Sequence, residues 1–129
     1  MKLYYPAVFS KDESSFSITF PDIPEAITQG DSFENAISMA KECLGLCLDT
    51  RIKNKEEIPN YSESSKIKLE KDEFFIMIEY DSLEFEKKYN CHAIRKNVTI
   101  PAWLNKIAEE ENINFSNVLQ NALIEKLKL

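Results

Sequence analysis

Hydrophobic residues gather in two short segments near the start of the chain, residues 3–9 and 15–20. Both are rich in aromatic and β-branched residues, and the polar stretch "SKDESS" connects them. This pattern predicts two strands joined by a turn. Pro21 and Pro24 should end the second strand, and residues 26–28 should add a short third strand.

A helical period begins at residue 33, where apolar positions recur three and four residues apart. Asp31 or Ser32 is the predicted N-cap, and Glu34 follows Asp31 by three residues, as in a capping box. Gly45 lowers the helix propensity slightly. The apolar stripe consists of Phe33, Ala36, Ile37, Ala40, Leu44, Cys47 and Leu48.

Two more strands are predicted after a polar loop, at residues 66–69 and at the mostly apolar residues 74–80. Residues 1–81 therefore predict the order β-β-β-α-β-β, a small α+β sheet with one long helix packed on a face. Residues 82–92 are charged and should form a short linking helix or turn. This linker contains no motif that we can interpret.

A different pattern begins at residue 94, where polar and apolar side chains alternate as in a half-exposed strand. Val98 and Ile100 fall on one side of this strand. The other side carries Arg95, Asn97 and Thr99. Lys96 falls on the apolar side, where an apolar residue would be usual. The register at the start of the strand therefore stays open.

Two helices should follow, the first with Pro101 at its first position and the second capped by Ser116. A strand and two helices in about 36 residues are too small a unit to fold alone, and a lone strand leaves backbone groups unpaired on both edges. Residues 93–129 therefore predict a homodimer, in which two strands pair antiparallel and four helices share a core. The predicted dimer core contains Val98, Ile100, Trp103, Leu119 and Leu123.

The outward side chains of such a two-stranded ribbon suit the major groove of DNA. Arginine can bond guanine and asparagine can bond adenine, each through two hydrogen bonds, and threonine can bond a base edge. Arg95, Asn97 and Thr99 are thus candidate base contacts. Ser116 and Asn117, at a helix N-terminus, are candidate phosphate contacts. The plainer interpretation, a polar face of any half-exposed strand, stays open.

Charge is unevenly distributed along the chain. Residues 1–90 hold 11 Lys+Arg against 18 Asp+Glu, a balance of −7, whereas residues 91–129 hold 5 against 4, a balance of +1. The acidic part suits a basic partner and does not suit bare nucleic acid. No apolar run is long enough to cross a bilayer and the first residues do not resemble a signal peptide, so we expect a cytoplasmic protein with reduced cysteines.

Residues 97–127, "NVTIPAWLNKIAEEENINFSNVLQNALIEKL", resemble a ribbon-helix-helix DNA-binding domain of the Arc and MetJ type. The upstream motifs "YPAVF", "FPDIP", "TQGDS" and "ENA" occur here in the order seen in the N-terminal domain of HicB antitoxins. The resemblance implies a type II toxin–antitoxin pair, whose toxin is a HicA-type protein, small and basic, that cleaves mRNA with a histidine.

The resemblance also implies a division of labour within the chain. Residues 1–81 would form a degenerate ribonuclease-H-like domain that covers the active site of the toxin, although the residues that touch it are not identified. Residues 82–92 would be a linker, and residues 93–129 would dimerise and repress the operon. Assembly beyond the dimer stays open. A stand-alone repressor with a ligand-sensing N-terminal domain is the alternative, but the sequence shows no sign of a ligand pocket.

An enzyme is not expected. Nucleases with a ribonuclease-H-like fold hold two metal ions with clustered carboxylates, one of them in the first strand, and residues 3–9 contain no carboxylate. Asp12, Glu13, Asp22 and Asp31 fall in a turn or loops, where solvated acids are ordinary. We therefore expect no catalytic residue and no cofactor.

A zinc site can be imagined from Cys43, Cys47, Cys91 and His92. Metal-binding cysteines usually form close pairs in turns, whereas Cys43 and Cys47 lie four apart on the predicted helix and suit core packing better. His92 is the only histidine, so no second base is available for a catalytic assembly.

Overall fold

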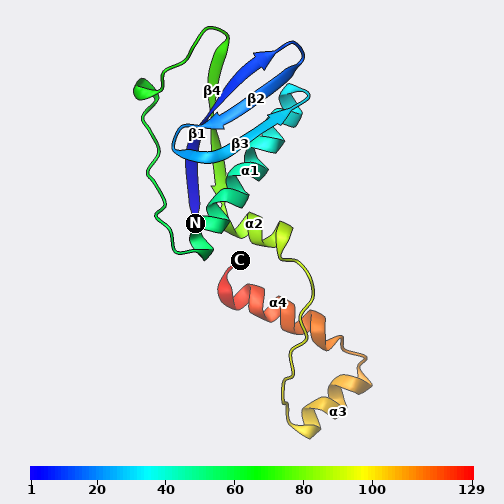
Figure 1. The fold of residues 1–129 in the computed structure, drawn as a ribbon. Helices are drawn as coiled ribbons and strands as arrows, with labels where there is room; N and C mark the ends of the chain where they lie inside the picture. Colours follow the sequence, from blue (N-terminus) through cyan, green and yellow to red (C-terminus); the bar gives the residue numbers. More distant parts are fainter. The chain divides into compact units, whose positions relative to one another are not determined.

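The computed structural model describes residues 1–129 and divides the chain into two compact units, residues 1–92 and residues 93–129 (Figure 1). The first unit is an antiparallel sheet with the strand order β3-β2-β1-β4. Its strands are β1 (Lys2–Asp12), β2 (Ser15–Phe20), β3 (Ile23–Gly30) and β4 (Glu73–Asp81).

Strand β1 lies in the middle of the sheet and fixes its register. Its second half pairs with β2, from Val8 opposite Thr19 onward, and β4 pairs with nearly its whole length. One face of the sheet is apolar because strand side chains alternate between the two faces. This inner face includes Tyr5, Ala7, Phe9, Phe16, Ile18, Phe20, Ile78 and Tyr80, all of them buried.

Helix α1 (Phe33–Lys53) covers the inner face of the sheet (Figure 1). Of the two candidate N-caps, the structure selects Ser32, whose Oγ accepts a hydrogen bond of 3.1 Å from the Asn35 amide. The capping box predicted a second hydrogen bond, from a backbone amide before the helix to the side chain of Glu34. The side chain that accepts it is instead that of Asn35, whose Oδ1 accepts a hydrogen bond of 2.9 Å from the Asp31 amide. The predicted stripe is confirmed at its centre, where Ala36, Ala40, Leu44 and Leu48 are fully buried.

Two predictions for the strands are wrong. The third strand is eight residues long and contains Pro24, which β3 tolerates because it lies at the edge of the sheet. The strand at residues 66–69, the fourth of the five predicted, does not form, so residues 1–81 have the order β-β-β-α-β. Ser64–Lys66 instead form a 3-10 turn. Of the two apolar residues that follow, Ile67 is partly buried and Leu69 is 40% exposed.

The predicted linker contains a helix, α2 (Ser82–Tyr89), which belongs to the first unit. Asp81 caps it, because its Oδ1 accepts hydrogen bonds from the amides of Leu83 and Glu84. The α+β class is confirmed, with four antiparallel strands in this unit. The ribonuclease-H-like arrangement stays a prediction.

The second unit contains α3 (Ala102–Glu110) and α4 (Phe115–Leu127). Pro101 is the N-cap of α3 rather than its first residue. The prediction that Ser116 caps α4 is wrong, because the helix begins one residue before it. Asn114 is the cap, and its Oδ1 accepts a hydrogen bond of 3.1 Å from the Asn117 amide.

The strand predicted at residues 94–100 is not formed by the single chain. A strand requires a neighbour that accepts and donates its backbone hydrogen bonds, and no other segment of residues 93–129 is extended beside it. Helices α3 and α4, by contrast, satisfy their hydrogen bonds internally and form without a partner. None of the helices in either unit has the length and apolarity required to span a lipid bilayer.

Candidate partner-binding surfaces

The apolar side chains of residues 93–129 lie at the surface. No residue of this unit is buried, and Trp103 and Val98 are 66% and 64% exposed. Of the predicted dimer-core residues, Ile100 and Leu123 are likewise exposed, and Leu119 is partly buried. A unit that leaves its tryptophan and most of its aliphatic side chains in water has an incomplete core.

The candidate base contacts are accessible in the single chain. Arg95, Asn97 and Thr99 are exposed and make no hydrogen bond within the chain. Lys96 is exposed as well, so the structure does not distinguish the two sides of this segment.

The N-terminus of α4 differs from the expectation in one respect. The Asn117 amide already donates to Asn114 Oδ1, so it is not available to a phosphate. The amides of Phe115 and Ser116 make no hydrogen bond within the chain and remain for such a contact.

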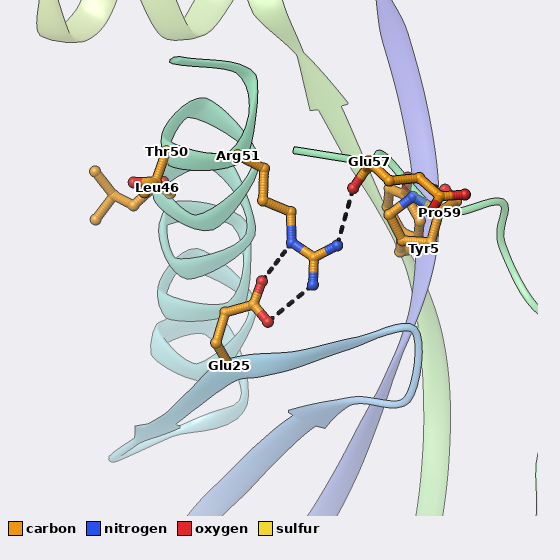
Figure 2. A network of polar contacts seen from close by, with 7 residues as sticks. All are labelled: Tyr5, Glu25, Leu46, Thr50, Arg51, Glu57 and Pro59. Atoms are coloured by element: carbon orange, nitrogen blue, oxygen red, sulfur yellow. Dashed lines mark hydrogen bonds and ion pairs between the residues drawn. The ribbon is translucent and has the colours of Figure 1, made fainter. Parts of the chain in front are cut away.

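In the first unit, Arg51 near the end of α1 connects three segments (Figure 2). Its guanidinium donates two hydrogen bonds to the Glu25 carboxylate, at 2.5 and 2.9 Å, and a third of 3.1 Å to the Glu57 carbonyl. The Arg51 guanidinium holds the pKa of the Glu25 carboxyl below its usual value, and the carboxylate in turn raises the pKa of Arg51. The pair joins the edge strand β3 to the helix.

The loop after α1 is held against the end of the sheet by two further contacts. The hydroxyl of Tyr5 donates a hydrogen bond of 2.5 Å to the Pro59 carbonyl, and burial raises the pKa of this tyrosine (Figure 2). The Asp22 carboxylate accepts hydrogen bonds from the amide and hydroxyl of Ser62. Asp22, expected to be a solvated loop acid, therefore has a structural role.

A cavity of about 140 Å³ lies between α1, β4 and α2. It forms where Phe85 of α2 packs on α1 at Gly45. Aromatic rings and carboxylates line it together, and among them are Tyr80, Phe85, Tyr89, Glu79, Asp81 and Glu84. No motif at these positions predicted a cavity. A glycine inside an amphipathic helix is nevertheless a weak sign of close packing.

The carboxylates of Glu79, Asp81 and Glu84 lie within 4.8 Å of one another. Asp81 is occupied as the cap of α2, and Glu84 pairs with Lys41 at 3.4 Å, so both groups already have partners within the chain. Two of the three residues therefore have an ordinary structural explanation, and Glu79 is the one without such a contact.

The two helical cysteines are suited to packing. Cys43 and Cys47 are partly buried against the core, and burial raises the pKa of Cys47 to about 11. Metal coordination requires the thiolate, which a raised pKa disfavours. Cys91 is exposed, outside this cluster.

Comparison with known proteins identifies the family. The family model described as HicB-like antitoxin of bacterial toxin–antitoxin systems matches residues 5–122, which include most of the sheet, α1, α2, α3 and most of α4. The chain belongs to the HicB-like antitoxin family.

Two curated relatives match less than half of this family member. Antitoxin HicB 2 of Photorhabdus laumondii is 43% identical over 58 residues, which are 45% of this chain and 42% of the relative. Antitoxin HicB 1 of the same organism is 39% identical over 56 residues, 43% of this chain and 36% of the relative. The chain spans less than half the length of the curated relatives it matches.

Solved structures match the HicB-like chain over nearly its full length. A chain of a toxin–antitoxin complex from Streptococcus pneumoniae is 27% identical, with a TM-score of 0.62, and the match covers 98% of this chain and 99% of that one. The antitoxin HicB of Burkholderia pseudomallei has the same fold, with a TM-score of 0.54 at 21% identity, and the match covers 98% and 97% of the two chains.

Proposed function

We propose that this protein is the antitoxin of a toxin–antitoxin pair. Its first unit binds and masks a HicA-type, mRNA-cleaving toxin, and its second unit dimerises as a ribbon-helix-helix domain and represses the operon that encodes the pair. The observation that carries the proposal is the family match over residues 5–122, because it spans both units. Toxin neutralisation is assigned to residues 1–81, connection to residues 82–92, and DNA binding to residues 93–129.

The charge of the first unit supports a basic partner. A toxin that grips RNA needs a positive surface, and residues 1–90 hold 18 Asp+Glu against 11 Lys+Arg. Complementary potentials speed the encounter of two proteins and disfavour partners of like charge. The acidic unit is thus suited to cover a ribonuclease and to avoid RNA itself.

The exposed apolar surface of the second unit supports a homodimer. Pairing residues 94–100 with the same segment of a second copy would give each strand a partner and allow Val98, Ile100 and Trp103 to be buried. The same pairing would bring Arg95, Asn97 and Thr99 of both copies onto one ribbon. In this arrangement they read base edges in the major groove.

The phosphate contact is proposed at the start of α4, with one change. Ser116 contributes its amide and hydroxyl, whereas Asn117 contributes only its side chain, since its amide is bonded to Asn114. The amide of Phe115, which the sequence did not suggest, becomes a third donor at this helix end.

The alternative, a stand-alone repressor that senses a small molecule, has little support. The cavity beside α2, at about 140 Å³, is below the roughly 300–1,000 Å³ of typical ligand sites. A larger open depression near the end of α1 includes Glu25 and Arg51, but these two groups already bond each other. Asn54, Glu56 and Glu57 also line it, but a depression this open to solvent would not bury most of a small molecule, as ligand sites usually do.

The test is co-expression with the protein encoded by the adjacent gene. An antitoxin forms a complex that survives purification and stops that protein from cleaving mRNA. If no complex forms and the chain still binds its own promoter DNA, the protein is a plain repressor and the antitoxin proposal fails.

A further inference from the structure

We propose that the cavity between α1, β4 and α2 receives one basic side chain of the toxin, an arginine or a lysine. This inference rests on the proposed function, because it specifies where the first unit contacts the toxin. The cavity is the contact point that the sequence could not identify.

The size of the cavity limits what it can hold. Its volume of about 140 Å³ is close to the ~150 Å³ of an engineered protein cavity that accommodates benzene. The end of one long side chain fits such a space, whereas a nucleotide or a typical metabolite does not.

The walls of the cavity combine two kinds of group that bind organic cations. The aromatic wall is continuous, since the ring centres of Phe85 and Tyr89 are 4.6 Å apart and those of Phe85 and Tyr80 are 6.1 Å apart. The carboxylates of Glu79 and Glu84 lie beside these rings. Acids alone would not define a site. Here an aromatic face can stack on a guanidinium or ammonium group while a carboxylate forms an ion pair with it.

At the margin of the cavity, two lysines of the chain itself already make such contacts, one with an aromatic ring and one with a carboxylate. Lys88 Nζ lies 5.3 Å from the centre of the Tyr89 ring, and Lys41 Nζ lies 3.4 Å from Glu84 Oε1. The side chains of Lys41 and Glu84 are 50% and 59% exposed, and an ion pair so accessible to water is weak. A cation of the toxin, shielded from water by the complex, can therefore replace either lysine.

The charge of the whole unit favours this occupant over others. With a balance of −7 on residues 1–90, the long-range field draws a basic surface toward the unit. An acidic side chain would be repelled by the carboxylates that line the cavity, and a neutral side chain would desolvate them without supplying an opposite charge. The occupant is thus a basic side chain of the basic partner.

The experiment measures the affinity of the full-length chain for the protein encoded beside it, with the histidine of that protein replaced so that both can be produced. The test variant is the double change Glu79→Gln and Glu84→Gln, and Asp81 is left intact because it caps α2. The matched control is Glu63→Gln with Glu70→Gln, which alters the charge equally in the exposed loop before β4. A third variant, Tyr89→Leu, removes one ring.

We expect the test variant and Tyr89→Leu each to weaken binding by about 10-fold or more, and the control by less than about 3-fold. In the neighbouring protein, changing the arginine or lysine that enters the cavity to glutamine should weaken binding to the unaltered chain. The same change should have little effect on binding to the test variant, because the partner carboxylates are already absent. Circular dichroism on each variant establishes that the unit stays folded.

Equal affinities for test variant and control would overturn the inference and leave the antitoxin function intact. Failure of the unaltered chain to bind the neighbouring protein would overturn both. If Tyr89→Leu binds as tightly as the unaltered chain while the carboxylate variant binds more weakly, the aromatic wall does not contact the toxin. That result would overturn the proposal that a basic side chain enters this cavity.

Discussion

Phe85 packs directly against Gly45, so closely that a Cβ added to the glycine would lie 2.9 Å from Phe85 Cδ2. The absence of a side chain at position 45 allows α2 to approach α1. This contact fixes one wall of the cavity, and it determines where Tyr89 and Glu84 lie.

Changing Gly45→Ala should therefore destabilise the protein, although alanine is the better helix former by about 1 kcal/mol. The added methyl group forces the ring of Phe85 outward, and such overpacking costs about 1–3 kcal/mol. We expect a net loss of about 1 kcal/mol in the free energy of unfolding, measured with urea. The double variant Gly45→Ala, Phe85→Leu should regain part of the loss. A more stable Gly45→Ala protein would mean that α2 does not dock there.

The Arg51–Glu25 pair should make stability depend on pH in the acid range. Because Arg51 lowers the pKa of Glu25 below its ordinary 4.5, the stabilisation is fully present above 4.5 and is lost as the pH falls through the lower folded-state pKa. Arg51→Gln should cost up to about 1 kcal/mol at neutral pH, since the pair is partly exposed. This difference from the unaltered chain should vanish in acid. Thermal unfolding at several pH values measures it.

A matched control exists on the same helix. Lys53 pairs with Asp49 at the surface, and its side chain is 72% exposed, so Lys53→Gln should leave stability nearly unchanged. If the two variants behave alike across the pH range, Arg51 does not hold β3 and the loop to the helix.

Trp103→Ala should weaken the homodimer by roughly 3–5 kcal/mol, the usual effect of removing a buried aromatic side chain. Sedimentation equilibrium measures the dissociation constant. Tyr61→Ala is a suitable control, because Tyr61 is 61% exposed and lies in the first unit. A Trp103→Ala dimer as stable as the parent would exclude this tryptophan from the core.

Asn97→Ala and Thr99→Ala should relax operator specificity with little effect on the dimer, since both side chains would face outward from the proposed ribbon, away from the shared core. Binding to the operator and to an unrelated duplex, each at several salt concentrations, separates base contacts from phosphate contacts. Ser116→Ala should instead weaken binding to both duplexes. Unchanged preference for the operator in both strand variants would contradict the assignment.

The sequence was sufficient for the parts of the fold that depend on local pattern. The strands at residues 3–9, 15–20 and 74–80 and the stripe of α1 follow from periodicity, which a buried face imposes on any sequence. The predicted strand at residues 66–69 failed because four alternating residues do not reveal whether a neighbouring strand exists. The cap of α4 failed because Asn114 and Ser116 are both good capping residues.

The candidate sites also differ in how far local sequence pattern could predict them. Alternation along residues 94–100 suggested which side chains face outward, although forming that strand requires a second chain. The cavity beside α2 was not predicted, because it depends on Gly45 of one helix meeting Phe85 of another, 40 positions later in the sequence. Contacts of this kind follow from tertiary packing and leave only weak local signals.

The central claim is that one chain inhibits a ribonuclease through its first unit and represses transcription through its second. The most direct measurement compares the full-length chain with residues 1–92 alone, each produced with the neighbouring protein and each offered promoter DNA. We expect both forms to bind that protein and stop mRNA cleavage, and only the full-length chain to bind DNA. DNA binding by residues 1–92, or uninhibited cleavage in the presence of the full-length chain, would contradict it.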